Sequence, residues 1–202
     1  MSIVKRLAVV LGVMYGVAFS LAARAQQATP GNADGPRYTG GTSLVRPANY
    51  REWMFLSSGL GMTYTPPGSA PPPSPTFGNV FVNPSSYRSF MQTGKWPNGT
   101  IFVLEFRKSD SEGSINKSGR FQSDLAGVEA EVKDSRFPDG WAYFNFGSAP
   151  SLSESAAPLA GERVAPCIDC HTKNTAVERT FVQFYPTLLE VARQKGTLKA
   201  GF

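Results

Sequence analysis

The sequence predicts an α+β fold in which a mostly antiparallel β-sheet carries a few short helices. Four segments show the two-residue alternation, or the β-branched and aromatic composition, that is typical of strands. Two shorter segments show helical spacing of apolar residues between a proline and a glycine. The chain has no internal repeat and no regular βαβ pattern, so we expect antiparallel pairing of neighbouring strands.

The predicted strands span residues 77–83, 100–106, 127–133 and 140–146. In the second of them Glu105 shares a face with Ile101 and Val103, an unusual place for a carboxylate without a partner. In the third, valine and alanine alternate with charged residues, as in a strand with one face in water. The other two carry aromatic and β-branched residues that fit a pleated surface.

The predicted helices are short. The first follows Asn83 as N-cap, begins at Pro84 and stops at Gly94. The second begins near Pro186 and stops at Gly196. Each places apolar side chains on one side, so each is expected to cover part of the sheet.

The first 25 residues resemble a secretory signal peptide. Lys5 and Arg6 precede an apolar run, and Ala23-Arg24-Ala25 supplies a small-x-small cleavage pattern. The run has about 16 residues, fewer than the roughly 20 of a membrane-spanning helix, so an uncleaved anchor is the less favoured alternative. We therefore expect export, and a periplasmic location.

Three further parts follow the predicted signal. Residues 26–46 are rich in glycine, threonine, proline and alanine and are expected to form a loose arm. Residues 47–202 are expected to form the functional domain. Within it, residues 65–75 contain six prolines, which predicts an extended, polyproline-like spacer.

The charge of the chain does not point to a polyanionic partner. The whole chain has 20 basic and 15 acidic residues, a formal charge of +5. Cleavage after Ala25 removes Lys5, Arg6 and Arg24, which leaves 17 basic residues and a charge of +2. Such a small charge gives no reason to expect nucleic acid or an anionic membrane surface as a partner.

The segment "APCIDCHTKNTAV" contains both cysteines and the only histidine of the chain. Cys167, Cys170 and His171 form the C-x-x-C-H pattern of covalent c-type haem attachment. In this pattern each thiol binds one vinyl group and the histidine ligates the iron. The predicted export agrees, because bacterial c-type haem attachment takes place outside the cytoplasm. One covalently bound haem c is therefore the predicted cofactor.

Two other interpretations of the motif stay open. A Cys-x-x-Cys redox pair usually begins a helix after a βαβ pattern, which is missing here. A structural zinc site needs four ligands, and carboxylates would have to complete it because the chain has no further cysteine or histidine.

The single histidine excludes bis-histidine ligation within one chain. The remaining soft ligands of the mature chain are Met54, Met62 and Met91, and an electron-transfer cytochrome would use one of them. None stands out, and methionine often only fills apolar gaps. We expect an open or water-bound sixth position on the iron.

Several segments together resemble the cytochrome P-460 family, which includes the cytochromes c′-beta. They are "YREWMFL", "NVFVNPSSYRSFMQTGKWPNGTIFVLEFR", "GVEAEVKDSRFPDGWAYFNF", "CIDCH" and "TFVQFYPTLLEVAR". The resemblance spans residues 49–193 and implies a mostly antiparallel β fold, a homodimer, and one five-coordinate c-type haem.

The resemblance leaves three functions open. Family members with a lysine-haem cross-link oxidise hydroxylamine, whereas c′-beta members lack the link and bind gases such as nitric oxide. The resemblance places the linking lysine near residues 77–83. This chain has no lysine there, since none lies between Lys5 and Lys95. We therefore expect a gas-binding protein, with hydroxylamine oxidation as the alternative and electron transfer to a partner cytochrome as the second alternative.

The resemblance also implies two distal-pocket residues. Arg51 is expected to donate to an iron-bound ligand or a haem propionate, or else to form a surface ion pair. Glu105 is expected to relay protons if its strand face lines the pocket. Aromatic residues at Phe77, Phe81, Phe102 and within 140–146 are expected to form either walls of the haem pocket or ordinary core.

Overall fold

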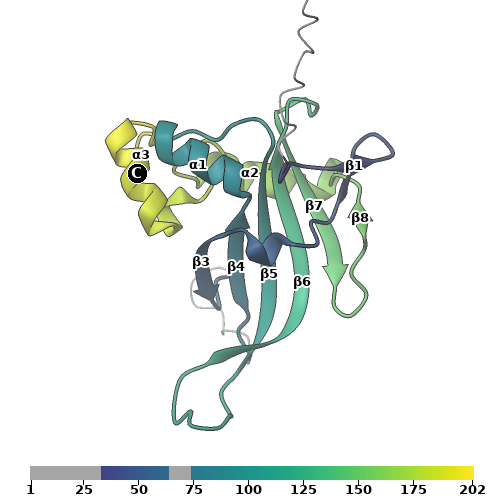
Figure 1. Ribbon diagram of the computed structural model, residues 1–202, viewed down its shortest axis with the longest axis vertical. Helices are drawn as coiled ribbons and strands as arrows, with labels where there is room; N and C mark the ends of the chain where they lie inside the picture. Colours follow the sequence, from purple (N-terminus) through teal and green to yellow (C-terminus); the bar gives the residue numbers. More distant parts are fainter. Residues whose placement is uncertain (1–32, 64–73) are drawn as a thin grey trace, which may run out of the picture. The chain divides into compact units, whose positions relative to one another are not determined.

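The computed structural model describes residues 33–63 and 74–202, and these form an α+β domain (Figure 1). The strands are β1 (Tyr38–Thr39), β2 (Ser43–Val45), β3 (Met54–Leu60), β4 (Phe77–Val82), β5 (Thr100–Asp110), β6 (Phe121–Lys133), β7 (Trp141–Ser148) and β8 (Ser155–Ala156). The helices are α1 (Pro84–Thr93), α2 (Ala165–Lys173) and α3 (Pro186–Lys195), with 3-10 turns η1 (Tyr50–Glu52), η2 (Gly161–Arg163) and η3 (Val182–Phe184). The predicted fold class is confirmed.

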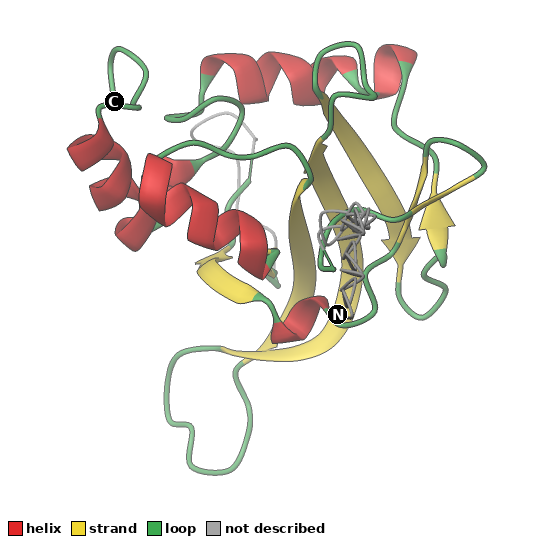
Figure 2. Cartoon of the chain, turned by 45° about the horizontal axis from the view of Figure 1, so that its top comes forward, coloured by secondary structure: helices red, strands yellow, loops and turns green. Residues whose placement is uncertain are grey.

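The main sheet is a five-stranded antiparallel meander with the order β3-β4-β5-β6-β7. All four predicted strands belong to it, and β3 is an edge strand that the sequence did not predict. Strands β5 and β6 are longer than predicted, and the loop that joins them extends away from the helices (Figure 2). A second sheet of three short strands has the order β1-β2-β8.

The main sheet separates two hydrophobic cores. Phe102 and Val82 project from the face that α1 and α3 cover, which we call the helix-side face. Ile101 and Val103 project from the opposite face, where they pack against Leu44 of β2. Each fully buried side chain of this size contributes about 1.5–3 kcal/mol, so both cores are substantial.

Helices α1 and α3 confirm the predicted boundaries. Gly94 and Gly196 end them in the left-handed conformation, at φ 70° and 64°, which glycine adopts without steric cost. Asn83 is the N-cap residue of α1, but its side chain makes no capping hydrogen bond. It accepts a hydrogen bond from the Ile101 amide at 2.9 Å instead, and Asp34 accepts from the Ser85 amide at 2.8 Å.

The predicted loose arm, residues 26–46, is wrong in its second half. Residues 26–32 lie outside the described part of the chain, but Tyr38–Thr39 and Ser43–Val45 form strands. Leu44 is fully buried in the opposite-face core. Composition alone missed this because it does not reveal tertiary contacts, such as the burial of Leu44, the hydrogen bond from the Ser85 amide to Asp34 and the hydrogen bond from the Tyr38 hydroxyl to Asp134.

The predicted signal peptide, residues 1–25, and most of the proline-rich spacer also lie outside the described residues. Within the described ranges, no helix is both long and apolar enough to cross a membrane.

Shortening Leu44 tests the attachment of β2. We expect Leu44→Ala to lower the free energy of unfolding by about 2–5 kcal/mol, because it removes a fully buried side chain from the core. Urea unfolding of the haem-loaded protein measures this. The control is Ser43→Ala in the same strand, whose side chain is only half-buried; equal stability of the two variants would contradict the placement of β2.

Candidate haem-binding site

The C-x-x-C-H motif lies on α2. Pro166 is in the first turn, where its missing N–H costs no hydrogen bond. Cys167, Cys170 and His171 are spaced i, i+3 and i+4, so they share one face of the helix. Both thiols are free and half-buried. A single helical turn therefore presents two thiols and an imidazole together.

The imidazole of His171 is held in one orientation. Its Nδ1 lies 2.7 Å from the carbonyl oxygen of Arg179. A carbonyl oxygen only accepts, so Nδ1 carries the proton and, in the neutral ring, Nε2 keeps a free lone pair. This is the arrangement found in histidines that ligate metals through Nε2.

A tight turn supplies the Arg179 carbonyl. The Thr180 amide donates to the Val177 carbonyl at 2.8 Å, and Glu178 takes a left-handed conformation at φ 50°. That conformation costs a non-glycine residue about 1–2 kcal/mol. The Glu178 carboxylate, which contacts the Lys133 ammonium at 2.5 Å, offsets part of this cost by fixing the turn to β6.

His171 packs against the helix-side face of the sheet. Its ring makes edge contacts with Tyr143 and Phe181, each with ring centroids 4.8 Å apart. Its Nδ1 also lies 3.1 Å from a carboxylate oxygen of Glu131. Glu131 is only 9% exposed, so the prediction that the charged side of residues 127–133 faces water is wrong at this position, because α2 covers it.

Burial and charge act in opposite directions on these groups. Burial raises the pKa of Glu131, and the neighbouring His171 only partly offsets this. Burial lowers the pKa of His171, but the Glu131 carboxylate more than compensates, so the net shift is upward. Burial, together with Glu129, raises the pKa of the Cys167 thiol.

An apolar strip lies beside α2 on the same sheet face. The register pairs Val80 with Leu104 and Gly78 with Phe106, so these residues project on the side of Phe102. Leu104 and Phe106 are half-exposed, and Gly78 leaves the Leu104 side chain room to lie over it. Two free thiols, a free Nε2 lone pair and an adjoining apolar surface fit the chemistry of a c-type haem.

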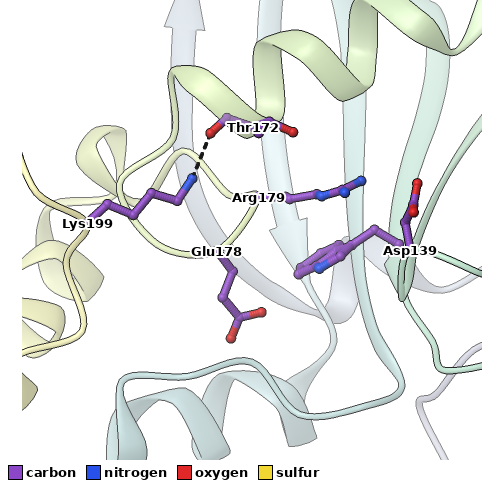
Figure 3. A pocket seen from close by; sticks show the side chains of 6 residues that line it. Asp139, Thr172, Glu178, Arg179 and Lys199 are labelled. Carbon is purple, nitrogen blue, oxygen red and sulfur yellow. Dashed lines mark hydrogen bonds between the residues drawn. The ribbon is translucent and has the colours of Figure 1, made fainter.

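A cavity of about 360 Å³ adjoins α2 on its C-terminal side (Figure 3). It is lined by Asp139, Trp141, Thr172, Glu178, Arg179 and Lys199. The Lys199 ammonium donates to the Thr172 carbonyl at 3.1 Å, which stabilises the end of the helix. Neither thiol lines this cavity.

The structure does not bring Arg51 and Glu105 together with His171. Glu105 pairs with Val128, and Phe102 pairs with Glu131, so Glu105 and Glu131 project from opposite faces. The sheet lies between both residues and His171, and the distal-pocket role of Arg51 and Glu105 stays a prediction. Alternation correctly grouped Glu105 with Ile101 and Val103, but that face packs against β2 and η1.

Glu105 instead forms a buried ion-pair network. Its Oε2 accepts from Tyr50 at 2.5 Å and from Arg51 Nε at 2.7 Å, and its Oε1 accepts from Arg107 Nε at 2.7 Å. Burial alone would raise the pKa of Glu105, but the bonds from Arg107, Tyr50 and Arg51 outweigh it and hold the pKa below 4.5. These contacts join β5 to η1.

The predicted aromatic walls divide between the two faces. Phe102, Trp141 and Tyr143 lie on the helix-side face with Glu131. Phe81, Phe144 and Phe146 lie on the other side, where they pack in or against the opposite-face core. Phe77 projects to the same side as Phe81, because the two residues are four positions apart in β4.

The three methionines occupy different places. Met91 packs against the helix-side core. Met54 lies on β3 opposite Val82, and the Met62 side chain lies over Gly59, so both are at the β3 edge of the helix-side face. Met54 is 38% exposed and Met62 is 64% exposed.

The lysines are accounted for by other contacts or by solvent. Lys95 is exposed, and Lys108, 62% exposed, lies 3.5 Å from Asp124. Lys133 projects from the helix-side face, but its ammonium contacts Glu178 and donates to the Trp96 carbonyl at 2.8 Å. Over the described residues, no group of three histidine, cysteine or acidic side chains could hold a metal ion, so the zinc alternative has no ligand set there.

Two thiols and an imidazole with a free Nε2 lone pair, presented by one helical turn, are the groups that c-type haem proteins use. Comparison with known families carries the identification further: residues 47–182 match the family model described as Cytochrome P460, and the chain belongs to the cytochrome P460 family. The match contains the whole C-x-x-C-H motif and the Arg179 turn, and it implies a c-type haem as cofactor. A comparison with curated proteins found no match.

Sequence reasoning missed the residues that support His171. The Arg179 carbonyl, Glu131 and Tyr143 come from three separate segments, and the sequence does not show that they meet. One signal was available: the alternation in 127–133 placed Glu131 on the side of the sheet away from Val128 and Val132, so a helix over that side would bury it.

The Glu105 network predicts a specific acid sensitivity. The pKa of Glu105 is lowered in the folded state, so the ionised carboxylate stabilises the fold. This stabilisation is complete above pH 4.5 and is lost as the pH falls below that value. We expect Glu105→Gln to lower the free energy of unfolding by about 1.5–3 kcal/mol at neutral pH, since a buried carboxylate loses its hydrogen bonds to two charged arginines, and to flatten the loss of stability below pH 4.5. Urea unfolding across pH 3–7 measures both effects.

Glu129→Gln is the matched control for this experiment. Burial raises the pKa of Glu129, so its ionised form is not a source of acid-sensitive stability. A wild-type pH profile in Glu105→Gln, or a flattened one in Glu129→Gln, would contradict the assignment.

Proposed function

We propose that this protein is an exported, periplasmic, mono-haem c-type cytochrome whose five-coordinate iron binds nitric oxide or a similar small gas. The observation that carries the proposal is the hydrogen bond from His171 Nδ1 to the Arg179 carbonyl. It fixes the tautomer that leaves Nε2 free to ligate iron. The signal-like first 25 residues support export.

Cys167 and Cys170 hold the haem covalently in this proposal. Each thiol adds across one vinyl double bond: the sulfur bonds to one vinyl carbon, the thiol proton goes to the other, and no oxidant is needed. His171 ligates from the same helix face. When bound, the haem supplies an iron whose sixth position takes the gas.

The surroundings of His171 favour an open sixth position and a small uncharged ligand. The half-exposed strip beside α2 is apolar at Val80, Leu104 and Phe106. An apolar surface excludes water and charged molecules more strongly than a neutral diatomic gas. The contacts of Lys133 with Glu178 and Trp96 also disfavour a lysine-haem cross-link, and with it hydroxylamine oxidation.

A homodimer is part of the proposal. The edge strand β3 exposes Phe55 and Leu60, which are 54% and 45% accessible, and an unpaired edge strand with apolar side chains favours pairing with a second chain. A partner cytochrome would be needed in the electron-transfer alternative, and hydroxylamine oxidation would also need one, or another oxidant, as its electron acceptor.

The visible spectrum of the ferrous protein tests the open position. We expect carbon monoxide or nitric oxide to shift the spectrum at low gas concentration, because no protein side chain has to be displaced. The electron-transfer alternative predicts no such shift, and a low-spin spectrum that disappears in one of Met54→Leu, Met62→Leu and Met91→Leu. Met91→Leu acts as the internal control, because Met91 packs in the helix-side core.

Peptide mass analysis tests the attachment and the enzyme alternative together. We expect one peptide, containing Cys167 and Cys170, to carry the mass of haem through two thioethers. Cys167→Ala and Cys170→Ala should each leave one thioether, and the double variant none. A haem mass that also links a lysine-containing peptide would overturn the gas-binding proposal in favour of hydroxylamine oxidation.

A further inference from the structure

Three unsatisfied polar atoms are gathered behind His171. Among the described residues, five buried side-chain nitrogen or oxygen atoms have no hydrogen-bond partner. Three of these are Glu131 Oε1, the Tyr143 hydroxyl and Arg179 Nη1. Buried polar atoms are nearly always paired, so such a group is costly and calls for a physical explanation.

The geometry around Nδ1 supplies one. The single proton on Nδ1 faces the Arg179 carbonyl at 2.7 Å, while Glu131 Oε1 lies 3.1 Å from the same nitrogen without an aligned hydrogen bond. The imidazole therefore has a neutral acceptor and an acidic acceptor within reach of one proton. A rotation of the ring, or of the Glu131 carboxylate, changes which of them takes the larger share.

We propose that Glu131 is a positioning residue for His171, whose carboxylate shares the Nδ1 proton with the Arg179 carbonyl in a buried polar cluster that also contains the Tyr143 hydroxyl and the Arg179 guanidinium. The inference rests on the proposed ligation of haem iron by His171. It assigns Glu131 to the proximal side of the haem, beyond the motif itself.

The contacts of Glu131 support this role. Glu131 is buried on the helix-side face of β6, and its direct cross-strand partner in β7 is Tyr143. The buried Nη1 of Arg179 has no hydrogen-bond partner, and the guanidinium charge acts to lower the pKa of both Glu131 and Tyr143. A buried carboxylate is tolerated only with such a partner.

The consequence is a more electron-rich imidazole. Hydrogen bonds to an ionised acceptor are roughly twice as strong as neutral ones. A stronger bond at Nδ1 raises the basicity of Nε2, strengthens the iron–histidine bond and favours the ferric state. Glu131 would therefore lower the reduction potential of the haem.

Glu131→Gln in the full, haem-loaded chain tests the proposal. The amide keeps the size of the side chain but removes its negative charge. We expect a more positive reduction potential in a spectroelectrochemical titration, and a lower iron–histidine stretching frequency in the resonance Raman spectrum of the ferrous protein. Glu131→Asp should keep part of both properties.

Glu129→Gln is the matched control. Glu129 is on the same strand and the same face, two residues away, and accepts from Asn145 at 2.9 Å rather than contacting His171. We expect it to leave the stretching frequency unchanged, even if loss of its charge shifts the potential. If both variants change the stretching frequency and the reduction potential equally, the effect is one of general charge and the proposal is overturned. The proposal is also overturned if Glu131→Gln changes neither property.

Two further outcomes have defined meanings. If Glu131→Gln does not fold or load haem, Tyr143→Phe provides the test, because it keeps the carboxylate but removes one of its neighbours; a stretching frequency unchanged from wild type then counts against the proposal. The reduction potential requires haem ligated by His171 but not gas binding. Shifts as expected without nitric oxide binding would sink the proposed function and leave the role of Glu131 standing.

Discussion

The hydrogen bond between His171 Nδ1 and the Arg179 carbonyl is the contact on which the site depends. It joins the C-terminal half of α2 to the turn that follows it, and the turn is itself fixed to β6 through Glu178 and Lys133. Thr175 adds a hydrogen bond from its hydroxyl to the His171 carbonyl at 2.5 Å. The helix, the turn and the sheet therefore determine the orientation of one imidazole together, and none of them does so alone.

The alternation of side chains in β5 and β6 divides the remaining chemistry between two faces. A strand places successive residues on opposite sides, so Phe102 and Glu131 meet the helices while Ile101, Glu105 and Val128 meet the small sheet. The Glu105 network stabilises the far side and has no access to His171. Two buried carboxylates in one sheet thus have separate roles, set by the parity of their positions.

The sequence predicted what depends on short-range chemistry and missed what depends on tertiary contact. The prolines and glycines that bound α1 and α3 act within a few residues, and they were sufficient to predict these helices. The spacing of Cys167, Cys170 and His171 is equally local, and it places the three side chains on one face of α2. Parity grouped Glu105 correctly with Ile101 and Val103, but nothing local shows which face a helix will cover. The Arg179 carbonyl and Glu131 are 8 and 40 residues from His171, and only the folded sheet brings them to it. The attachment of Leu44 was missed for the same reason.

The site is polar behind His171 and apolar beside it, and this asymmetry has a physical cause. Charged groups can be buried behind the imidazole because Glu131, Arg179 and His171 compensate one another there. The strip at Val80, Leu104 and Phe106 carries no charge of its own, and the Glu129 carboxylate beside Leu104 offers nothing to an anion, so an anion would lose its hydration on entering the strip without gaining a partner. A neutral gas has little hydration to lose. In the proposed function, where His171 ligates the iron, the buried carboxylate therefore lies behind the ligand, and the apolar strip discriminates between small molecules by their hydration.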